Sequence, residues 1–168
     1  MVPFIICSSR HNNELVYEGE IVAATRAIPL IIKKSLVEQA VKISEEVGGI
    51  FSVNKLKSLD TGLIITGNEV YSGRIKDNFE KIIRAKLNHF DCELKEVIIL
   101  PDDAEKIKNG ILSLLNMELG LILVTGGMSV DPDDVSMVAI AAAGAQNIIY
   151  GYPVLPGAMF LYANFGNV

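Results

Sequence analysis

The chain has 168 residues, of which 50% are hydrophobic, and its mean hydropathy of +0.37 is too high for a disordered chain. Its formal net charge of -5, without a cluster of lysine and arginine, argues against nucleic acid or an anionic membrane as the main partner. The longest apolar stretch, residues 21–32, is broken by Arg26 and Pro29 and is too short to cross a bilayer, and the first residues lack a charged signal-peptide start, so a cytoplasmic protein is expected.

Residues 1–57 are expected to form an N-terminal flank made of strands and one helix. Ser35 followed by Glu38 predicts a capping box at the start of this helix, and the two glycines at positions 48 and 49 predict its end. The apolar positions between these signals share one helical face: Leu36, Ala40, Ile43 and Val47.

Residues 58–168 are expected to form an α/β domain. Short β-rich runs alternate there with amphipathic helical stretches, which is the pattern of βαβ units on a mainly parallel sheet. Strands are predicted at residues 62–66, 96–100, 120–125 and 147–150. Three helical stripes lie between them: Phe79, Ile82, Ile83 and Leu87; Ile107, Ile111, Leu114 and Leu115; and Val135, Val138, Ala139 and Ala142. Asp77 with Glu80, and Asp102 with Glu105, resemble capping boxes at the starts of two helices.

The last residues predict an incomplete unit. Residues 153–157 resemble a turn that leads into a short apolar helix at residues 158–163. A crossover helix without a following strand is unfinished, so we expect the chain to be a piece of a longer protein, with its α/β domain truncated at the C-terminus.

Residues 125–134 are the most informative segment, because two glycines and three carboxylates come directly after an apolar strand. Gly126 and Gly127 allow a sharp turn and a close approach of the backbone to a ligand, and the start of the next helix attracts an anion. Carboxylates beside an anion call for a cation between them. Mg²⁺ fits, because it bridges one or two carboxylates to phosphate oxygens.

Two other interpretations of this segment compete with a ligand site. Asp131 is also a suitable N-cap with Pro132 as the first helical residue, which leaves Asp134 as the carboxylate without a structural explanation. The serine at position 129 lacks the second glycine of a nucleophile elbow, so a serine hydrolase is set aside.

Three loops are expected to share the carboxyl edge of the sheet, where open α/β sheets bind their ligands. The loops at residues 67–77, 101–103 and 125–134 bring acids, cations and glycines to that edge: Glu69, Asp77, Asp102 and Asp134; Arg74 and Lys76; and Gly67, Gly73, Gly126 and Gly127. Arg74 and Lys76 are alternatively solvated charges, and Asp77 is alternatively a helix cap. Glu69 stands between glycines, where no helix stripe or strand face requires a carboxylate.

Three motifs in these loops carry a family resemblance. They are Thr66-Gly67-Asn68-Glu69-Val70 with Gly73-x-Ile75-x-Asp77, then Pro101-Asp102-Asp103, then Thr125-Gly126-Gly127-Met128-Ser129-Val130 with Asp134-Val135. Over roughly residues 60–163 the chain resembles the molybdopterin-binding domain family. This family includes molybdopterin adenylyltransferase, molybdopterin molybdotransferase, the corresponding gephyrin domains and the competence-damage-type proteins.

The resemblance implies a three-layer α/β/α domain that binds the pterin dithiolene and its phosphate or adenylyl group at the loop edge. It also implies homo-oligomers, either trimers as in adenylyltransferase-like members or dimers as in molybdotransferase-like ones. Asp102 and Asp134 match two aspartates implicated in catalysis, and Glu69 matches the glutamate of the molybdotransferase T-G-[DN]-E motif. The residues that match the glycine-rich phosphate loop are Gly126, Gly127 and Ser129.

The chain departs from the family pattern in two places. It has Asp131 where many members have glycine, followed by Pro132 and Asp133. It also ends before the G-L-P-G segment that contributes to the family's pterin site. The N-terminal flank matches neither the short adenylyltransferase nor the multidomain molybdotransferase, which suggests a longer prokaryotic molybdopterin-binding protein.

The resemblance therefore predicts binding of molybdopterin or adenylyl-molybdopterin in molybdenum cofactor biosynthesis. Mg²⁺ is expected at Asp102 and Asp134, with Gly67, Glu69, Gly73 and Asp77 among the ligand-binding residues, and with ATP as a further ligand if the chain is an adenylyl transferase. Molybdate transfer is the other transferase reaction. The alternative is a non-catalytic carrier or sensor of the cofactor, and a nucleotide hydrolase related to the competence-damage branch stays open.

Overall fold

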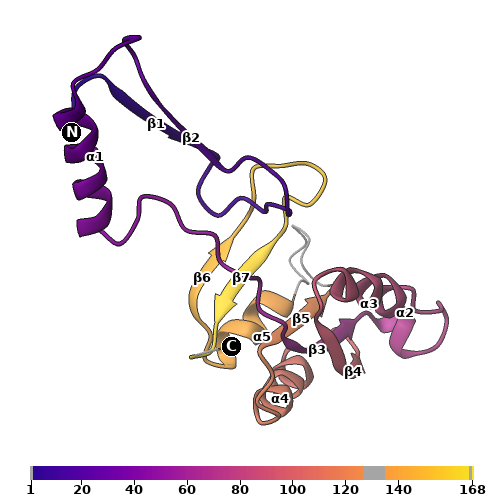
Figure 1. The fold of residues 1–168 in the computed structure, drawn as a ribbon. Helices are drawn as coiled ribbons and strands as arrows, with labels where there is room; N and C mark the ends of the chain where they lie inside the picture. The colour runs from indigo at the N-terminus through magenta and orange to yellow at the C-terminus, as the bar shows by residue number, and fades with distance from the viewer. Residues whose placement is uncertain (1, 127–134, 167) are drawn as a thin grey trace. The chain divides into compact units, whose positions relative to one another are not determined.

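The computed structural model describes residues 2–126, 135–166 and 168. The chain divides into two compact units, Met1–Lys55 and Leu56–Val168. Figure 1 labels the helices and strands of both units. None of the helices within the described ranges is long and apolar enough to cross a membrane.

The first unit contains a β-hairpin and one helix. Strands β1 (Ile5–Ser9) and β2 (Ala23–Ala27) pair antiparallel, and helix α1 (Lys34–Glu46) follows them (Figure 1). The predicted capping box at Ser35 is wrong, because the helix already begins at Lys34 and its N-cap residue, Lys33, makes no side-chain capping bond. The predicted glycine end is confirmed. Gly49, with φ of +107°, donates its N–H to the carbonyl of Ser44 at 2.8 Å.

The first unit has no buried core of its own. Residues 2–55 include no buried side chain, and Leu30 and Ile31 are 106% and 89% exposed. Helix α1 is amphipathic but buries none of its residues. The chain's buried hydrophobic residues all lie in the second unit, within the part of the chain that the structure describes.

A parallel sheet of three strands forms the centre of the second unit. Strands β3 (Asp60–Thr66), β4 (Glu93–Leu100) and β5 (Leu121–Thr125) lie in the order β4-β3-β5. Their apolar runs suit a sheet that is covered on both faces. The three corresponding predicted strands are confirmed, although β3 and β4 begin earlier than predicted.

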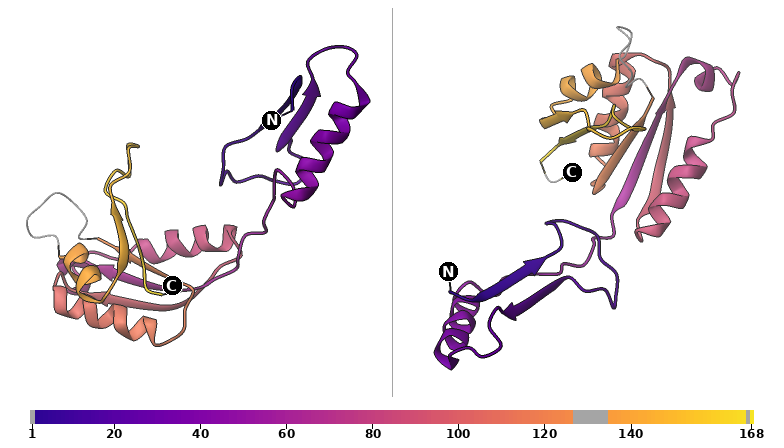
Figure 2. Two further views of the ribbon diagram at one scale, coloured as in Figure 1. Left: turned by 90° about the vertical axis from the view of Figure 1, so that its left-hand side faces the viewer. Right: turned by 90° about the horizontal axis from the view of Figure 1, so that it is seen from above.

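Helices cover both faces of this sheet, which makes the three-layer architecture that the family resemblance implies. Figure 2 shows α3 (Phe79–His89) on one face, and α4 (Ala104–Leu115) and α5 (Ser136–Ala142) on the other. Successive residues of β3 alternate between the two layers. Leu63 and Ile65 join the core on the α3 side, whereas Ile64 joins the core beneath α4 and α5.

The end of the chain is a hairpin, not a helix. Strands β6 (Gln146–Tyr150) and β7 (Leu161–Asn164) pair antiparallel, with Tyr150 opposite Leu161 (Figure 1). The predicted fourth strand therefore exists but pairs outside the parallel sheet, and the predicted helix at residues 158–163 is wrong. A short apolar run fits a helix or a strand equally by pattern, and here the aromatic and β-branched residues of the hairpin favour strands.

The helical stripes are confirmed only in part. Ile107, Ile111 and Leu114 of α4 are buried as predicted, but Phe79 and Ile82 of α3 are 48% and 51% exposed. The other two residues of the stripe, Ile83 and Leu87, pack in the core on this side of the sheet. In α5 the buried residues are Ser136, Ala139 and Ile140, and the predicted Val138 and Ala142 are exposed.

Capping agrees with the prediction at the start of α3 and differs from it at the start of α4. Asp77 caps α3, because its carboxylate accepts bonds from the N–H groups of Phe79 at 2.8 Å and Glu80 at 3.1 Å. Helix α4 is capped by Asp103, not by Asp102: Asp103 has an extended backbone and accepts from the Lys106 N–H at 3.1 Å. Helix α5 is described over Ser136–Ala142. Asp131 and Pro132 themselves lie outside the described residues.

Candidate functional site

The carboxyl ends of the three parallel strands bring three loops to one edge of the sheet. The strands end at Thr66, Leu100 and Thr125. A backbone hydrogen bond connects the first residue after β3 to the last residue of β4: the Gly67 N–H donates to the Leu100 carbonyl at 3.2 Å. The short helix α2 (Asn68–Tyr71) follows β3 directly and was not predicted from the sequence.

Asp102 is held at this edge by Asn68 through two hydrogen bonds. The Asn68 backbone N–H donates to Asp102 Oδ2 at 3.0 Å, and the Asp102 backbone N–H donates to Asn68 Oδ1 at 3.3 Å. Because Asp103 caps α4, the Asp102 carboxylate does not have the capping role that was predicted for it. Its orientation is set instead by a neighbouring loop.

Glu69 lies beside Asn68 in the first turn of α2, with an exposed side chain. The loop folds back on its backbone, since the Glu69 carbonyl accepts from the N–H groups of Arg74 at 2.9 Å and Ile75 at 3.2 Å. Gly73 has φ of +72°, a backbone conformation that glycine adopts without strain. The loop thus places Glu69 on the same strand-to-helix connection as Asn68, while Arg74 is exposed.

The carboxylate of Asp77 has a different environment from that of Asp102. Both of its oxygens accept capping bonds from the start of α3. Asp77 is thus a helix cap, which was the alternative to a ligand-binding role. The ligand-binding role of Asp77 remains a prediction. Lys76, next to it, is exposed.

Gly126 is packed tightly against the end of β3. A Cβ atom at this position would lie 2.6 Å from Thr66 Oγ1 and 2.7 Å from the Thr66 carbonyl oxygen, and φ is +93°. The Thr66 hydroxyl donates to the Thr125 carbonyl at 3.1 Å, and the buried Ser136 hydroxyl donates to the Gly126 carbonyl at 3.1 Å. The close packing of Gly126 against Thr66 therefore requires glycine at position 126, independently of any ligand.

Thr125 carries an unsatisfied polar group at the same edge. Its Oγ1 atom is buried and has no hydrogen-bond partner among residues 2–126, 135–166 and 168, which is uncommon for a hydroxyl in a protein interior. A polar ligand atom or an ordered water at the carboxyl edge would satisfy it. Thr66 and Thr125 stand in the sequence motifs without a predicted role, and no role was predicted for Ser136. A threonine at the end of a buried strand beside a glycine is a signal that could have been used.

Several predicted site residues lie outside the described residues: Gly127, Ser129 and Asp134. In the described part of the chain, no group of three or more histidine, cysteine, aspartate or glutamate side chains could hold a metal ion. Asp102 lies in the described part of the chain and Asp134 does not, so their expected pairing around a metal ion stays a prediction. The donors present at the edge, a carboxylate and a hydroxyl, are oxygen groups of the kind that Mg²⁺ prefers.

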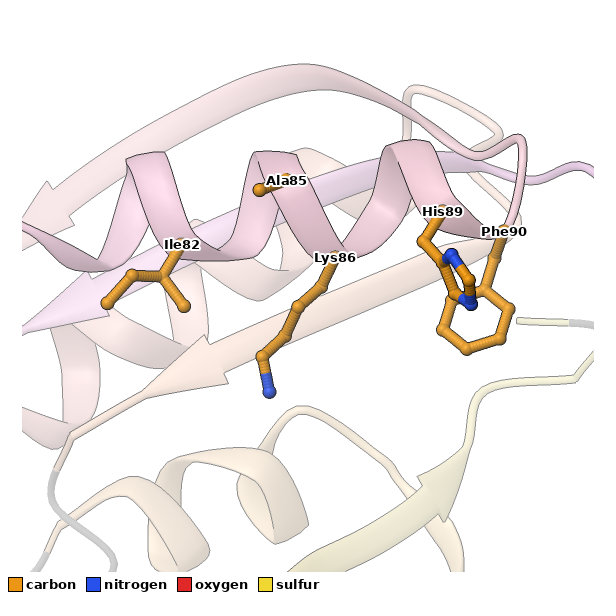
Figure 3. Close-up of a pocket in the computed structure, with 5 residues that line it drawn as sticks. All are labelled: Ile82, Ala85, Lys86, His89 and Phe90. Carbon is orange, nitrogen blue, oxygen red and sulfur yellow. The ribbon is translucent and has the colours of Figure 1, made fainter.

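A groove of about 490 Å³ lies elsewhere, along the outer flank of α3. Figure 3 shows the side chains that line it: Ile82, Ala85, Lys86, His89 and Phe90. None of these residues belongs to the three loops. The groove is therefore separate from the carboxyl-edge site and is a product of the exposed flank of α3.

The sheet, its helices and its loops define an α/β domain with a ligand edge of the kind described for open parallel sheets. Residues 62–165 match the family described as a probable molybdopterin binding domain, and the chain belongs to that family. The match includes all three loops.

Curated relatives are similar to parts of this chain. The chain is 26% identical over 144 residues to a molybdopterin molybdenumtransferase from Synechococcus elongatus, covering 80% of this chain and 36% of that protein. It is 28% identical over 81 residues to a CinA-like protein from Amoebophilus asiaticus, covering 48% of this chain and 20% of that protein. The chain thus spans about a third or less of the length of these two relatives.

Among solved structures, the fold is similar to that of the protein CinA from Thermoplasma acidophilum. The TM-score is 0.50 at 20% identity, and the match covers 55% of this chain and 54% of that chain. At this identity the likeness concerns the fold alone.

Proposed function

We propose that the chain binds molybdopterin, or its adenylylated form, at the carboxyl edge of the β4-β3-β5 sheet, and that it acts in molybdenum cofactor biosynthesis. The observation that carries the proposal is the placement of Asp102. Asp103, and not Asp102, caps α4, and Asn68 holds the Asp102 carboxylate beside α2. The family membership of residues 62–165 supports the choice of ligand.

Asp102 is proposed to hold Mg²⁺ together with Asp134. One Asp102 oxygen, Oδ2, accepts from the Asn68 N–H, and the second oxygen is available for a cation. When bound, Mg²⁺ would neutralise charge on the phosphate oxygens of the ligand. The N–H groups of Gly126 and Gly127 would position those oxygens, and the Thr125 hydroxyl would gain the partner that it lacks.

Transfer of an adenylyl group or of molybdate is proposed as the reaction. Either transfer depends mainly on positioning and on electrostatic stabilisation, so it needs no serine or cysteine nucleophile. The chain would contribute the acids Asp102, Asp134 and Glu69 and the backbone of the glycine loop. A homo-oligomer, dimeric or trimeric, is part of the proposal, and sedimentation equilibrium measures it directly.

The first test is calorimetry of the full chain with molybdopterin and with adenylyl-molybdopterin, each with and without Mg²⁺. The Asp102→Ala variant is expected to lose Mg²⁺-dependent binding. Asp103→Ala is the matched control, because it removes a carboxylate from the same loop. The Asp103 carboxylate caps α4 and is not part of the proposed site. Equal losses in both variants, or no loss in either, would contradict the proposal.

Turnover is tested separately by the consumption of ATP with Mg²⁺ when molybdopterin is present. Asp134→Asn is expected to abolish turnover and to leave the circular dichroism spectrum unchanged. Retained turnover in this variant would rule out the role of Asp134. Binding without consumption of ATP, and without conversion of adenylyl-molybdopterin when molybdate is added, would instead indicate a carrier or sensor of the cofactor.

A further inference from the structure

The reciprocal contact between Asn68 and Asp102 connects two loops that come from different strands. Asn68 is the first residue of α2, after β3, and Asp102 follows β4. Each residue donates its backbone N–H to the side-chain oxygen of the other, at 3.0 Å and 3.3 Å. A pair of bonds in this arrangement fixes both the separation of the two loops and the direction of the Asp102 carboxylate.

Asp102 has no other described group that fixes its side chain. The adjacent aspartate, Asp103, takes the capping position of α4, so the helix does not orient Asp102. Asn68 itself is exposed, and both of its hydrogen bonds with Asp102 are at exposed positions. The contact therefore contributes more to orientation than to the stability of the fold.

We infer that Asn68 is a positioning residue, which holds the Asp102 carboxylate in one rotamer at the ligand edge. Its importance for binding rests on the function proposed above, whereas the rotamer of Asp102 can be measured without any ligand. Partners that orient a metal-binding carboxylate through hydrogen bonds commonly change metal affinity about ten- to hundredfold when removed.

Three substitutions at position 68 separate the two hydrogen bonds. Asn68→Asp keeps an acceptor oxygen at the Oδ1 position and keeps the backbone donor, so both bonds can still form, and it adds a negative charge beside Asp102. Asn68→Ala removes the side-chain acceptor and keeps the backbone N–H. Asn68→Pro removes both, and proline is tolerated at the first position of a helix because its fixed φ suits that position. Asn88→Ala is the control, since Asn88 is an exposed asparagine in α3.

The first measurement is the χ1 rotamer of Asp102 in the full chain, from three-bond NMR couplings to its Cγ. A single rotamer is expected in the unmodified chain, in Asn68→Asp and in Asn88→Ala. Partial averaging is expected in Asn68→Ala and full averaging in Asn68→Pro. An unchanged single rotamer in Asn68→Pro, in a chain whose other amide shifts show that it is folded, would overturn the inference.

The second measurement is the affinity for Mg²⁺ alone, by titration of the same variants. Affinity is expected to fall about ten- to hundredfold in Asn68→Pro, to fall less in Asn68→Ala and to be retained in Asn68→Asp. If the unmodified chain binds no Mg²⁺, the proposed metal role of Asp102 fails, and the couplings alone decide whether Asn68 orients it. If Asn68→Asp and Asn68→Pro lose affinity equally while the rotamers differ, orientation by Asn68 has no functional effect and the positioning role is refuted.

Discussion

Replacement of Gly126 by alanine tests how the glycine loop is built. The new Cβ would lie 2.6 Å from Thr66 Oγ1 and 2.7 Å from the Thr66 carbonyl oxygen, so the backbone at the ends of β3 and β5 must shift. The positive φ of +93° adds a cost of roughly 1–2 kcal/mol for a residue with a side chain. Overpacking against the β3 end adds roughly 1–3 kcal/mol.

The sum is a loss of about 2–5 kcal/mol, a large share of the roughly 5–15 kcal/mol that stabilises a typical domain. Urea unfolding followed by circular dichroism measures this loss as a lower midpoint. Gly73→Ala is the matched control, because Gly73 also has positive φ, at +72°, but a Cβ there meets no atom within 4 Å. The control is expected to lose only about 1–2 kcal/mol, from the backbone conformation alone.

A double variant, Gly126→Ala with Thr66→Ala, refines the test. Removal of the Thr66 hydroxyl relieves the contact at 2.6 Å but leaves the carbonyl contact at 2.7 Å, because that oxygen belongs to the backbone. Recovery is therefore expected to be partial. If Gly126→Ala costs no more than Gly73→Ala, the close approach to Thr66 does not constrain this position and the reasoning is refuted.

Three further predictions concern capping, the core and the two units. Asp103→Ala is expected to lower the free energy of unfolding by about 1 kcal/mol through loss of the α4 cap, whereas Asp102→Ala leaves it nearly unchanged; thermal unfolding of both variants decides this. Leu114→Ala, at a fully buried position of α4, is expected to cost about 2–5 kcal/mol in urea unfolding, and a cost under 1 kcal/mol would contradict the assigned core. Residues 56–168 are expected to unfold cooperatively when produced alone, while residues 1–55 are not, because they bury no side chain; calorimetry of the two fragments would refute this if the shorter one showed a sharp transition.

The parallel sheet was predictable because its signal is strong and local. The apolar runs of β3, β4 and β5 are too hydrophobic for strands with one wet face, and the amphipathic stretches between them have the length of crossover helices. The C-terminal hairpin was not predictable in the same way. Its apolar residues fit either periodicity, and the pairing of β6 with β7 depends on a turn whose geometry composition does not specify.

The roles of neighbouring aspartates could not be separated by pattern alone. Asp102 and Asp103 both precede α4, and a spacing of three residues to Glu105 selected the first as the cap. In the structure, the backbone of Asp103 is extended at the N-cap, with φ of -136° and ψ of 117°, and its side chain reaches the Lys106 N–H. The first residue of α4 decides which of the two aspartates is the cap. A sequence defines helix starts only to within one or two residues. Asp102 then becomes available to the neighbouring loop.

The glycine loop shows why a functional role cannot be tested at every residue that a motif contains. Gly126 was predicted to allow a ligand to approach, yet its own chain already occupies the space where a side chain would be. Any substitution there changes packing and binding together, so a loss of ligand affinity would not identify its cause. Asp102 lacks this ambiguity, because its carboxylate does not cap α4 and does not fill the core. The decisive variants for the proposed site are therefore those at Asp102 and at the residue that orients it, Asn68.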